Sequence, residues 1–433
     1  ILYYIEPWIQ FSRPTWKKDY IWWFGDISRK LLEIRNVKSH FILNEGCATF
    51  HKEFDRCDST YTVIYYDELL DIFPNDKNAL YSWQQKSYKA VEIFKMQSLI
   101  KNKLPNFIPD YVFTITPTPF LEKLFPKAAF VYRDAMYVRE PFPDELTSFD
   151  TRGLYCNSSI FHQYNKIQKI NYGLKEKNFI NRFRDIFLYN DFVPQEIIRE
   201  IDSLKDRFKF ILIFPLQAED DFNFYIFNNK NNFNFVYETF KKIPSEIGVI
   251  ITKHPDHNEI NQDSIKFLES KFMNFIYLEA LENYHAPSQL LLEYVDGMIT
   301  LSSGLGYYAL MHQKPIFTIK KSHLTPFSTN IKIENIFEFL NKITNSEVSY
   351  GHIHNDKILF FLLTRYNFSY HYMFNPEWLC SRLEFLNDNK EKIDSDITFL
   401  PYIDEPEIIL ENLDKNKRSF KLKRDIKNNI FNK

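Results

Sequence analysis

The chain has 433 residues, of which 45% are hydrophobic, and a formal net charge of −2. This length predicts two domains with sizeable cores. The near-zero net charge excludes a protein that attracts nucleic acid through a positive overall electrostatic field. The four cysteines have neither metal-ligand spacing nor a dense disulfide pattern, which favours a reducing, cytoplasmic setting, and no apolar run approaches the roughly 20 residues of a membrane-spanning helix.

The first half of the chain is predicted to alternate strands with helices. Short apolar runs indicate strands, and apolar residues that recur every three or four positions indicate amphipathic helices. We expect strands at 2–5, 40–43, 62–66, 111–115 and 129–132, and helices at 26–34, 81–103 and 195–204. This alternation is typical of a mostly parallel sheet that is covered by helices.

The second half repeats the pattern more regularly. We expect strands at 208–214, 248–252, 275–278, 297–300 and 315–319, with helices at 235–243, 264–272, 288–294 and 306–312. Five strands with crossover helices predict a Rossmann-like domain. The remainder is expected to be helical, at 333–343, 357–365 and 376–387, and it ends in a basic tail over residues 415–433.

Together these elements predict an α/β chain of GT-B-like architecture, which many sugar transferases use. It would have two Rossmann-like domains facing a cleft, residues 1–190 and 191–325, and a helical C-terminal segment, residues 326–433. Open parallel sheets bind ligands outside the carboxyl ends of their strands, so we expect the functional site at that edge.

Three segments rich in polar and glycine residues each follow an expected strand of the second half. They are Pro215-Leu-Gln-Ala-Glu-Asp-Asp221, Lys253-His-Pro255 and Ser302-Ser-Gly-Leu-Gly306. Because successive β-α units place the carboxyl ends of their strands at one edge, we expect an acid, a histidine and a hydroxyl-glycine turn to meet there.

The turn at Ser302, Ser303 and Gly304 opens an expected helix. Backbone N–H groups at a helix N-terminus, with two hydroxyls, form a site for an anion such as a nucleotide-sugar phosphate. The alternative is that one serine is only the N-cap of the helix. His254 can donate to a phosphate oxygen and Lys253 adds positive charge, or His254 is a bystander in its loop.

Asp220 and Asp221 have two interpretations. They form a solvated turn, or one of them acts as the base or nucleophile of glycosyl transfer. Neighbouring side chains of an extended segment point in opposite directions, so at most one is expected to enter the cleft. The pair lacks the spacing of a metal-binding Asp-x-Asp, and we find no other carboxylate cluster that requires a metal.

These segments, with residues 295–310 and Lys314-Pro315, resemble the bacterial capsule-polysaccharide biosynthesis family. Within it they are most similar to the retaining β-Kdo glycosyltransferases, which transfer 3-deoxy-D-manno-oct-2-ulosonic acid (Kdo) from CMP-Kdo. The resemblance is clear over about 205–320 and looser over 111–159. It implies a metal-independent glycosyltransferase of capsule or lipopolysaccharide synthesis, whose N-terminal domain faces the acceptor and whose C-terminal domain binds the nucleotide sugar.

The resemblance also implies roles for individual residues. Asp221, four residues after the glutamine of the Leu-Gln motif, takes the place of the catalytic aspartate. His254 takes the place of the histidine near the CMP phosphate. Ser302 and Ser303 take the places of the phosphate-binding hydroxyls. The complete donor-binding set would be Gln217, Lys253, His254, Ser302, Ser303 and Gly304.

The family also uses an acidic residue of the N-terminal domain near the acceptor. The candidates are Glu140, Glu145 and Asp150. Asp150 is favoured because it lies in the better-matched segment. The carboxylate of Kdo requires a cation, for which the candidates are Arg139, Arg152 and Lys253.

Two other functions stay open. In the first, the chain has the same fold but uses another donor, as a transferase or epimerase of a UDP-, GDP- or other CMP-sugar such as CMP-sialic acid. The other is a non-catalytic module of a polysaccharide-assembly complex. The expected partners are a nucleotide-sugar donor and a saccharide or glycolipid acceptor, and no nucleic acid. The basic tail is either a solvated end or a contact with the anionic inner-membrane surface.

Overall fold

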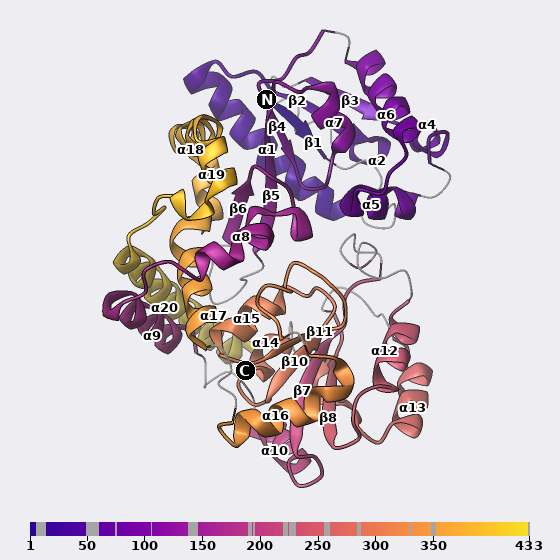
Figure 1. The fold of residues 1–433 in the computed structure, drawn as a ribbon, viewed down its shortest axis with the longest axis vertical. Helices are drawn as coiled ribbons and strands as arrows, with labels where there is room; N and C mark the ends of the chain where they lie inside the picture. Colours follow the sequence, from indigo (N-terminus) through magenta and orange to yellow (C-terminus); the bar gives the residue numbers. More distant parts are fainter. Residues whose placement is uncertain are drawn as a thin grey trace. The chain divides into compact units, whose positions relative to one another are not determined.

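The computed structural model (Figure 1) divides into two compact units. The first comprises residues 1–135, 146–163 and 366–401, and the second comprises residues 136–145, 164–365 and 402–433. Within these units the structure describes residues 1–5, 14–48, 60–73, 76–104, 106–136, 146–188, 193, 195–219, 224, 231–254, 260–283, 287–329, 331–347 and 352–431.

The first unit is built on a seven-stranded sheet in the order β12-β6-β5-β4-β1-β2-β3. Its strands are β1 (Leu2–Tyr4), β2 (His40–Asn44), β3 (Thr60–Ile64), β4 (Tyr111–Thr114), β5 (Ala129–Met136), β6 (Leu146–Asp150) and β12 (Asn367–Ser369). Strands β1 to β5 pair in parallel, whereas β12 runs antiparallel to β6. The buried ring of Tyr3 lies against Phe24, Phe41 and Phe113, so aromatic side chains fill the core beside the central strand.

Helices surround this sheet. They are α1 (Pro14–Arg35), α2 (Glu45–Ala48), α4 (Tyr66–Leu70), α5 (Asp76–Gln85), α6 (Ala90–Lys103), α7 (Pro119–Leu124), η1 (Tyr155–Asn157), α8 (Ser159–Ile167), η5 (Tyr370–Phe374), α18 (Pro376–Asp388), α19 (Lys390–Ser395) and η6 (Ile397–Phe399). Helix α7 begins with proline, whose missing N–H costs nothing at the first helical position.

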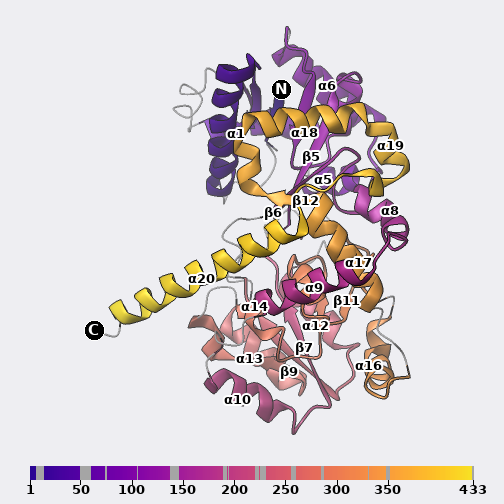
Figure 2. The same cartoon turned by 90° about the vertical axis from the view of Figure 1, so that its left-hand side faces the viewer.

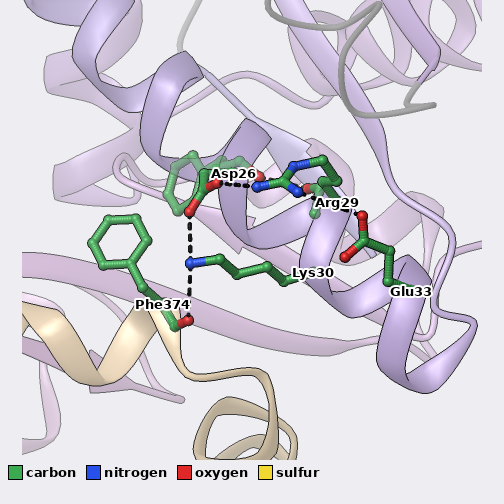
Figure 3. A network of polar contacts seen from close by, with 7 residues as sticks. Asp26, Arg29, Lys30, Glu33 and Phe374 are labelled. Carbon is green, nitrogen blue, oxygen red and sulfur yellow. Dashed lines mark hydrogen bonds and ion pairs between the residues drawn. The ribbon is translucent and has the colours of Figure 1, made fainter.

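C-terminal residues complete the first unit. The carboxylate of Asp26 on α1 contacts Arg29 and Lys30, each at 2.9 Å. The Lys30 ammonium also donates to the carbonyl of Phe374 at 3.5 Å (Figure 3). Helix α18 packs on α1 as well (Figure 2), so residues of the C-terminal segment are held against an N-terminal helix that is far from them in sequence.

The second unit is built on a five-stranded sheet in the order β11-β10-β7-β8-β9. Its strands are β7 (Phe210–Pro215), β8 (Ile247–Thr252), β9 (Phe275–Tyr277), β10 (Gly297–Thr300) and β11 (Ile316–Thr318). All neighbouring pairs are parallel. Every residue of β7, β8 and β10 is buried, as expected for central strands that are covered on both faces.

The helices of the second unit connect these strands or pack outside them. They are α9 (Leu174–Phe187), α10 (Gln195–Leu204), α12 (Asn232–Phe240), α13 (Gln262–Lys271), η2 (Glu279–Asn283), α14 (Pro287–Leu291), α15 (Leu305–Met311), η3 (Ile333–Asn335), α16 (Ile336–Thr344), α17 (His352–Phe361), η4 (Leu362–Tyr366) and α20 (Pro406–Phe431). Helix α20 lies beside α9 in both views (Figures 1 and 2). In the part of the chain that the structure describes, no helix has both the length and the apolar character to cross a bilayer.

The predicted fold class is confirmed. The chain is α/β and has the parts of a GT-B-like fold: two Rossmann-like units with mainly parallel sheets, and helical C-terminal elements. All five strands expected in the second half are present, and α10 has the predicted limits. A cleft between the two domains stays a prediction.

Two of the differences between the compact units and the predicted ranges involve helices and strands that the structure describes. Helix α9 belongs to the second unit, because Phe179 contacts Phe360 of α17 and Phe187 contacts Tyr308 of α15. The C-terminal segment is divided between the units, because residues 367–369 add strand β12 to the first sheet. Both differences come from contacts between residues that are distant in sequence, which local patterns do not reveal.

The single helix expected over 81–103 is wrong, because the chain forms two helices there, α5 and α6. Lys86 adopts a left-handed backbone conformation with φ of 55°. The N–H of Ser87 donates to the carbonyl of Ser82 at 2.8 Å, five residues back. These are the features of a Schellman ending, which closes α5 without glycine.

Candidate functional site

The three motif segments follow three adjacent strands of the second sheet. Strand β7 lies between β10 and β8, with Gly297 opposite Leu212 and Thr252 opposite Pro215. Because all three strands run in the same direction, their carboxyl ends form one continuous edge. The described parts of the motif segments therefore lie at this edge, as the sequence predicted.

The side chain of Gln217 joins the end of β7 to the end of β10. Its Oε1 accepts the backbone N–H of Ser302 at 3.1 Å, and its Nε2 lies 3.1 Å from the Ser302 hydroxyl. The carbonyl of Gln217 in turn accepts from the side-chain amide of Asn232 at 2.7 Å. Ser302 is only 3% exposed. The Gln217–Ser302 contact thus fixes the start of the serine-glycine turn from inside the unit.

The rest of the turn is closed by local hydrogen bonds. The N–H of Ser303 donates to the Thr300 hydroxyl at 3.0 Å, and the Ser303 hydroxyl accepts the N–H of Leu305 at 3.3 Å. The N–H of Gly306 donates to the Ser303 carbonyl at 3.0 Å. The Ser303 side chain therefore satisfies the N–H of Leu305, the first residue of α15. The N-cap position of α15 is occupied by Gly304, so neither serine is the N-cap that the alternative interpretation expected. Phosphate binding at this turn stays a prediction.

Lys253 is held by an acidic partner that the sequence did not suggest. Its ammonium lies 2.6 Å from the Glu282 carboxylate and 5.0 Å from the centre of the Tyr277 ring. The Tyr277 hydroxyl donates to the same carboxylate. Hydrogen bonds from Lys253 and then from Tyr277 lower the pKa of Glu282. His254 follows directly and is half-buried at the same strand end.

Two hydroxyls extend the polar edge beyond β8. The side chains of Thr252 and Ser288 lie 2.7 Å apart, and Thr252 is 2% exposed. Ser288 is the second residue of α14, which leads into β10. Sequence reasoning missed Ser288, Glu282 and Asn232, because each meets its partner only after the β-α units have folded against one another.

Asp150 is enclosed within the first unit and is 2% exposed. Its Oδ1 accepts the backbone N–H of Arg152 at 2.7 Å and the Ser159 hydroxyl at 3.0 Å. Its Oδ2 accepts the backbone N–H of Ser159 at 2.7 Å and the hydroxyl of Tyr366 at 2.8 Å. Burial raises the pKa of Asp150. These contacts make Asp150 a support of the loop between β6 and α8, and its catalytic role stays a prediction.

Several predicted residues lie outside the described part of the chain. Among them are the catalytic candidates Asp221 and Glu145, and also Asp220, Glu140 and Arg139. Arg152 is described and exposed at the start of the Asp150 loop. Among the described residues, no group of three or more histidine, cysteine, aspartate or glutamate side chains could hold a metal ion.

The chain is similar to several solved structures at low identity. It is 13% identical to the S. aureus MnaA–UDP co-structure, covering 82% of this chain and 90% of that one with a TM-score of 0.33. It is 17% identical to Thermosulfurimonas dismutans KpsC, beta Kdo 2,7 transferase, covering 68% and 88% with a TM-score of 0.30. For the beta Kdo 2,4 transferase of the same protein these values are 9%, 60%, 80% and 0.35.

No curated protein matches the chain. The family model described as capsule polysaccharide biosynthesis protein matches residues 153–323. This range contains β7, β8 and β10 and all three motif segments. Over these residues the chain resembles the capsule polysaccharide biosynthesis family.

Proposed function

We propose that this chain is a glycosyltransferase of capsule or surface-polysaccharide synthesis that transfers Kdo from CMP-Kdo, with retention, to a saccharide or lipid-linked acceptor. The observation that carries the proposal is that the described parts of the motif segments meet at the ends of β10, β7 and β8. These segments also carry the family resemblance. A non-catalytic module would have no need for this combination of polar groups at a ligand-binding edge.

The proposed donor site needs to hold one phosphate and one carboxylate. His254 and Ser303 are the proposed phosphate contacts, and Gln217 is proposed to position Ser302 beside them. Lys253 is bound to Glu282, but an ammonium has three N–H donors, so it can keep this partner and still donate to a donor oxygen. A CMP-sugar has a single phosphate, and these side chains are proposed to bind it without a metal.

The proposed chemistry assigns the attacking group to Asp221. Its carboxylate would attack the anomeric carbon of Kdo as the bond to the CMP phosphate breaks, and CMP would leave with the bonding electron pair. The acceptor hydroxyl would then displace the carboxylate and lose its proton to a base, so that two inversions give net retention. Glu145 and Asp150 are the proposed acids of the acceptor side, and the buried contacts of Asp150 favour Glu145 for direct contact.

Nucleotide binding tests the donor assignment first. We expect CMP to raise the thermal unfolding temperature and UDP to leave it unchanged, because the proposed site recognises a cytidine nucleotide. Gln217→Ala should weaken CMP binding, since Ser302 loses its contacts with the glutamine side chain. Gln262→Ala, on the exposed start of α13 in the same unit, is the matched control. Stabilisation by UDP without any effect of CMP would remove the CMP-Kdo proposal.

Product formation tests the reaction. The full chain should transfer Kdo from CMP-Kdo to a saccharide acceptor with the metal chelator EDTA present, and Asp221→Asn should abolish transfer while CMP binding remains. Deletion of the tail after Leu413 should reduce transfer to a vesicle-borne acceptor more than transfer to a soluble one, because the tail is proposed to contact the inner-membrane surface. An Asp221→Asn variant with full activity would refute the proposed nucleophile.

A further inference from the structure

Helix α6 has apolar side chains on two opposite faces. Ile93, Met96 and Ile100 are buried and hold the helix against the first unit. On the other face, Val91 is 56% exposed and Phe94 is 67% exposed. Residues three apart on a helix share a face, so Val91 and Phe94 form one apolar patch that is open to solvent. Both views show α6 at the periphery of its unit (Figures 1 and 2).

Lysines surround this patch. The exposed cations between residues 86 and 103 are Lys86, Lys89, Lys95 and Lys101. The same stretch contains one carboxylate, that of Glu92. This carboxylate accepts the backbone N–H of Lys89 at 2.9 Å and lies 3.9 Å from the Lys89 ammonium, so it offsets one of the four positive charges. The surface around Val91 and Phe94 is therefore positively charged.

The neighbouring helix α7 places one further cation near the start of α6, next to Glu122, whose carboxylate accepts the hydroxyl of Tyr132. Lys123 of α7 lies 5.5 Å from the centre of the Tyr88 ring, just before the start of α6. Lys103, by contrast, lies at the far end of the helix and is paired with Glu68 at 2.7 Å. The basic character is thus concentrated around the first two turns of α6, where the exposed apolar side chains also lie.

We propose that the α6 face, defined by Lys86, Lys89, Val91, Phe94 and Lys95, docks the first unit onto an anionic lipid bilayer. Val91 and Phe94 would enter the boundary between head groups and acyl chains. The lysines would remain at the level of the lipid phosphates, with their aliphatic stems along the apolar surface. Charge complementarity with anionic lipid is the reason for choosing this partner.

A second copy of this chain is a poorer partner for the same face. In a two-fold symmetric contact the patch of one copy meets the same patch of the other, so the lysines of the two copies would oppose one another. Like charges that face each other across an interface are unfavourable. The proposal does not depend on the nature of the sugar donor, and it concerns a surface separate from the basic tail.

Flotation with vesicles tests the proposal on the full chain. Wild-type protein should float with vesicles that contain phosphatidylglycerol and bind much less to vesicles of phosphatidylcholine alone. The double variant Val91→Ser/Phe94→Ser should lose about tenfold or more of the binding, because it removes the side chains that enter the bilayer. Changing Lys86, Lys89 and Lys95 to glutamine should lower binding by about fivefold for each charge.

A matched control and a second measurement decide the outcome. Met273→Ser removes another strongly exposed apolar side chain, 78% exposed and located in the second unit, and should leave binding unchanged. Because the replaced side chains face outward, the variants should keep the thermal unfolding temperature of the wild type. Normal vesicle binding by both α6 variants would overturn the proposal. So would a wild-type dimer that Val91→Ser/Phe94→Ser converts to a monomer in light scattering, since the face would then join two copies.

Discussion

Replacing Arg184 by methionine tests a buried ion pair that joins three helices of the second unit. The guanidinium of Arg184 on α9 lies 2.5 Å from the carboxylate of Asp356 on α17, and the two side chains are 8% and 12% exposed. The same guanidinium donates to the carbonyls of Met311 at 3.0 Å and Leu310 at 3.3 Å. These carbonyls belong to the last turn of α15, the helix that begins at the serine-glycine turn. Arg184 therefore helps to fix the position of this helix.

The expected cost follows from the burial of the remaining charge. Without Arg184, the carboxylate of Asp356 keeps the longer contact to the Tyr172 hydroxyl at 3.4 Å. Breaking one partner of a buried pair costs about 3–5 kcal/mol, whereas replacing both partners by apolar side chains is often nearly neutral. We therefore expect Arg184→Met to destabilise the second unit by about 3–5 kcal/mol, and the double variant Arg184→Met/Asp356→Leu to recover most of that loss.

Hydrogen exchange measures this effect locally, because a chain of two units need not unfold in one transition. Amides of α9, α15 and α17 should exchange faster in Arg184→Met and return toward wild-type rates in the double variant. Lys205→Met removes the surface pair with Asp202, whose side chains are 53% and 55% exposed, and should cost less than about 1 kcal/mol. A double variant no more stable than the single one would refute the reasoning.

Two further substitutions probe packing and protonation. Asp150→Asn places an amide group opposite the backbone N–H of Ser159 and should destabilise the first unit by about 1–3 kcal/mol in urea unfolding, because one buried donor loses its acceptor. Burial raises the pKa of Asp150 in the folded protein above its value of 3.8 in the unfolded chain. The stability of the wild type relative to this variant should therefore increase as pH falls through the raised pKa and level off below about 3.8. A stability difference that does not depend on pH would contradict this. Gly306→Ala would bring a Cβ to within 2.7 Å of the buried Leu324 side chain and should lower stability by about 1–3 kcal/mol, with an unchanged melting temperature as the contrary result.

The edge of the second sheet was predictable from the sequence, because its strands are short apolar runs separated by crossover helices. Buried parallel strands need no alternation of polar and apolar residues, so continuous runs such as the one ending at Phe214 stand out. Once the strand ends are known, parallel pairing alone brings Gln217, His254 and Ser302 to one edge. This part of the site depends on topology more than on individual contacts.

The contacts themselves were not predictable, because their partners are far apart in the chain. Lys253 and Glu282 are separated by 29 residues, Thr252 and Ser288 by 36, and Asp150 and Tyr366 by 216. No helical or strand period connects such positions. Strand β12 was missed for a related reason: three residues give no recognisable pattern, and their pairing with β6 is decided by the tertiary fold.

The Lys253–Glu282 contact allows a test of how Lys253 would act in the proposed donor site. If a nucleotide phosphate binds beside Lys253, the Glu282 carboxylate competes with it for the ammonium and also repels it. Glu282→Gln should then tighten CMP binding, by up to about fivefold, because a charge pair that is partly open to solvent contributes about 1 kcal/mol.

Isothermal titration at neutral pH measures this change directly. Glu246→Gln, a charge-neutralising variant of an exposed residue at the opposite end of β8, should leave CMP affinity unchanged. If Glu282 only positions Lys253 for the nucleotide, its neutralisation should weaken binding instead. Weaker binding would mean that the Lys253 ammonium binds the phosphate only while Glu282 holds it in position. Tighter binding would mean that Glu282 and the phosphate compete for the ammonium, so the two outcomes assign different roles to the same contact.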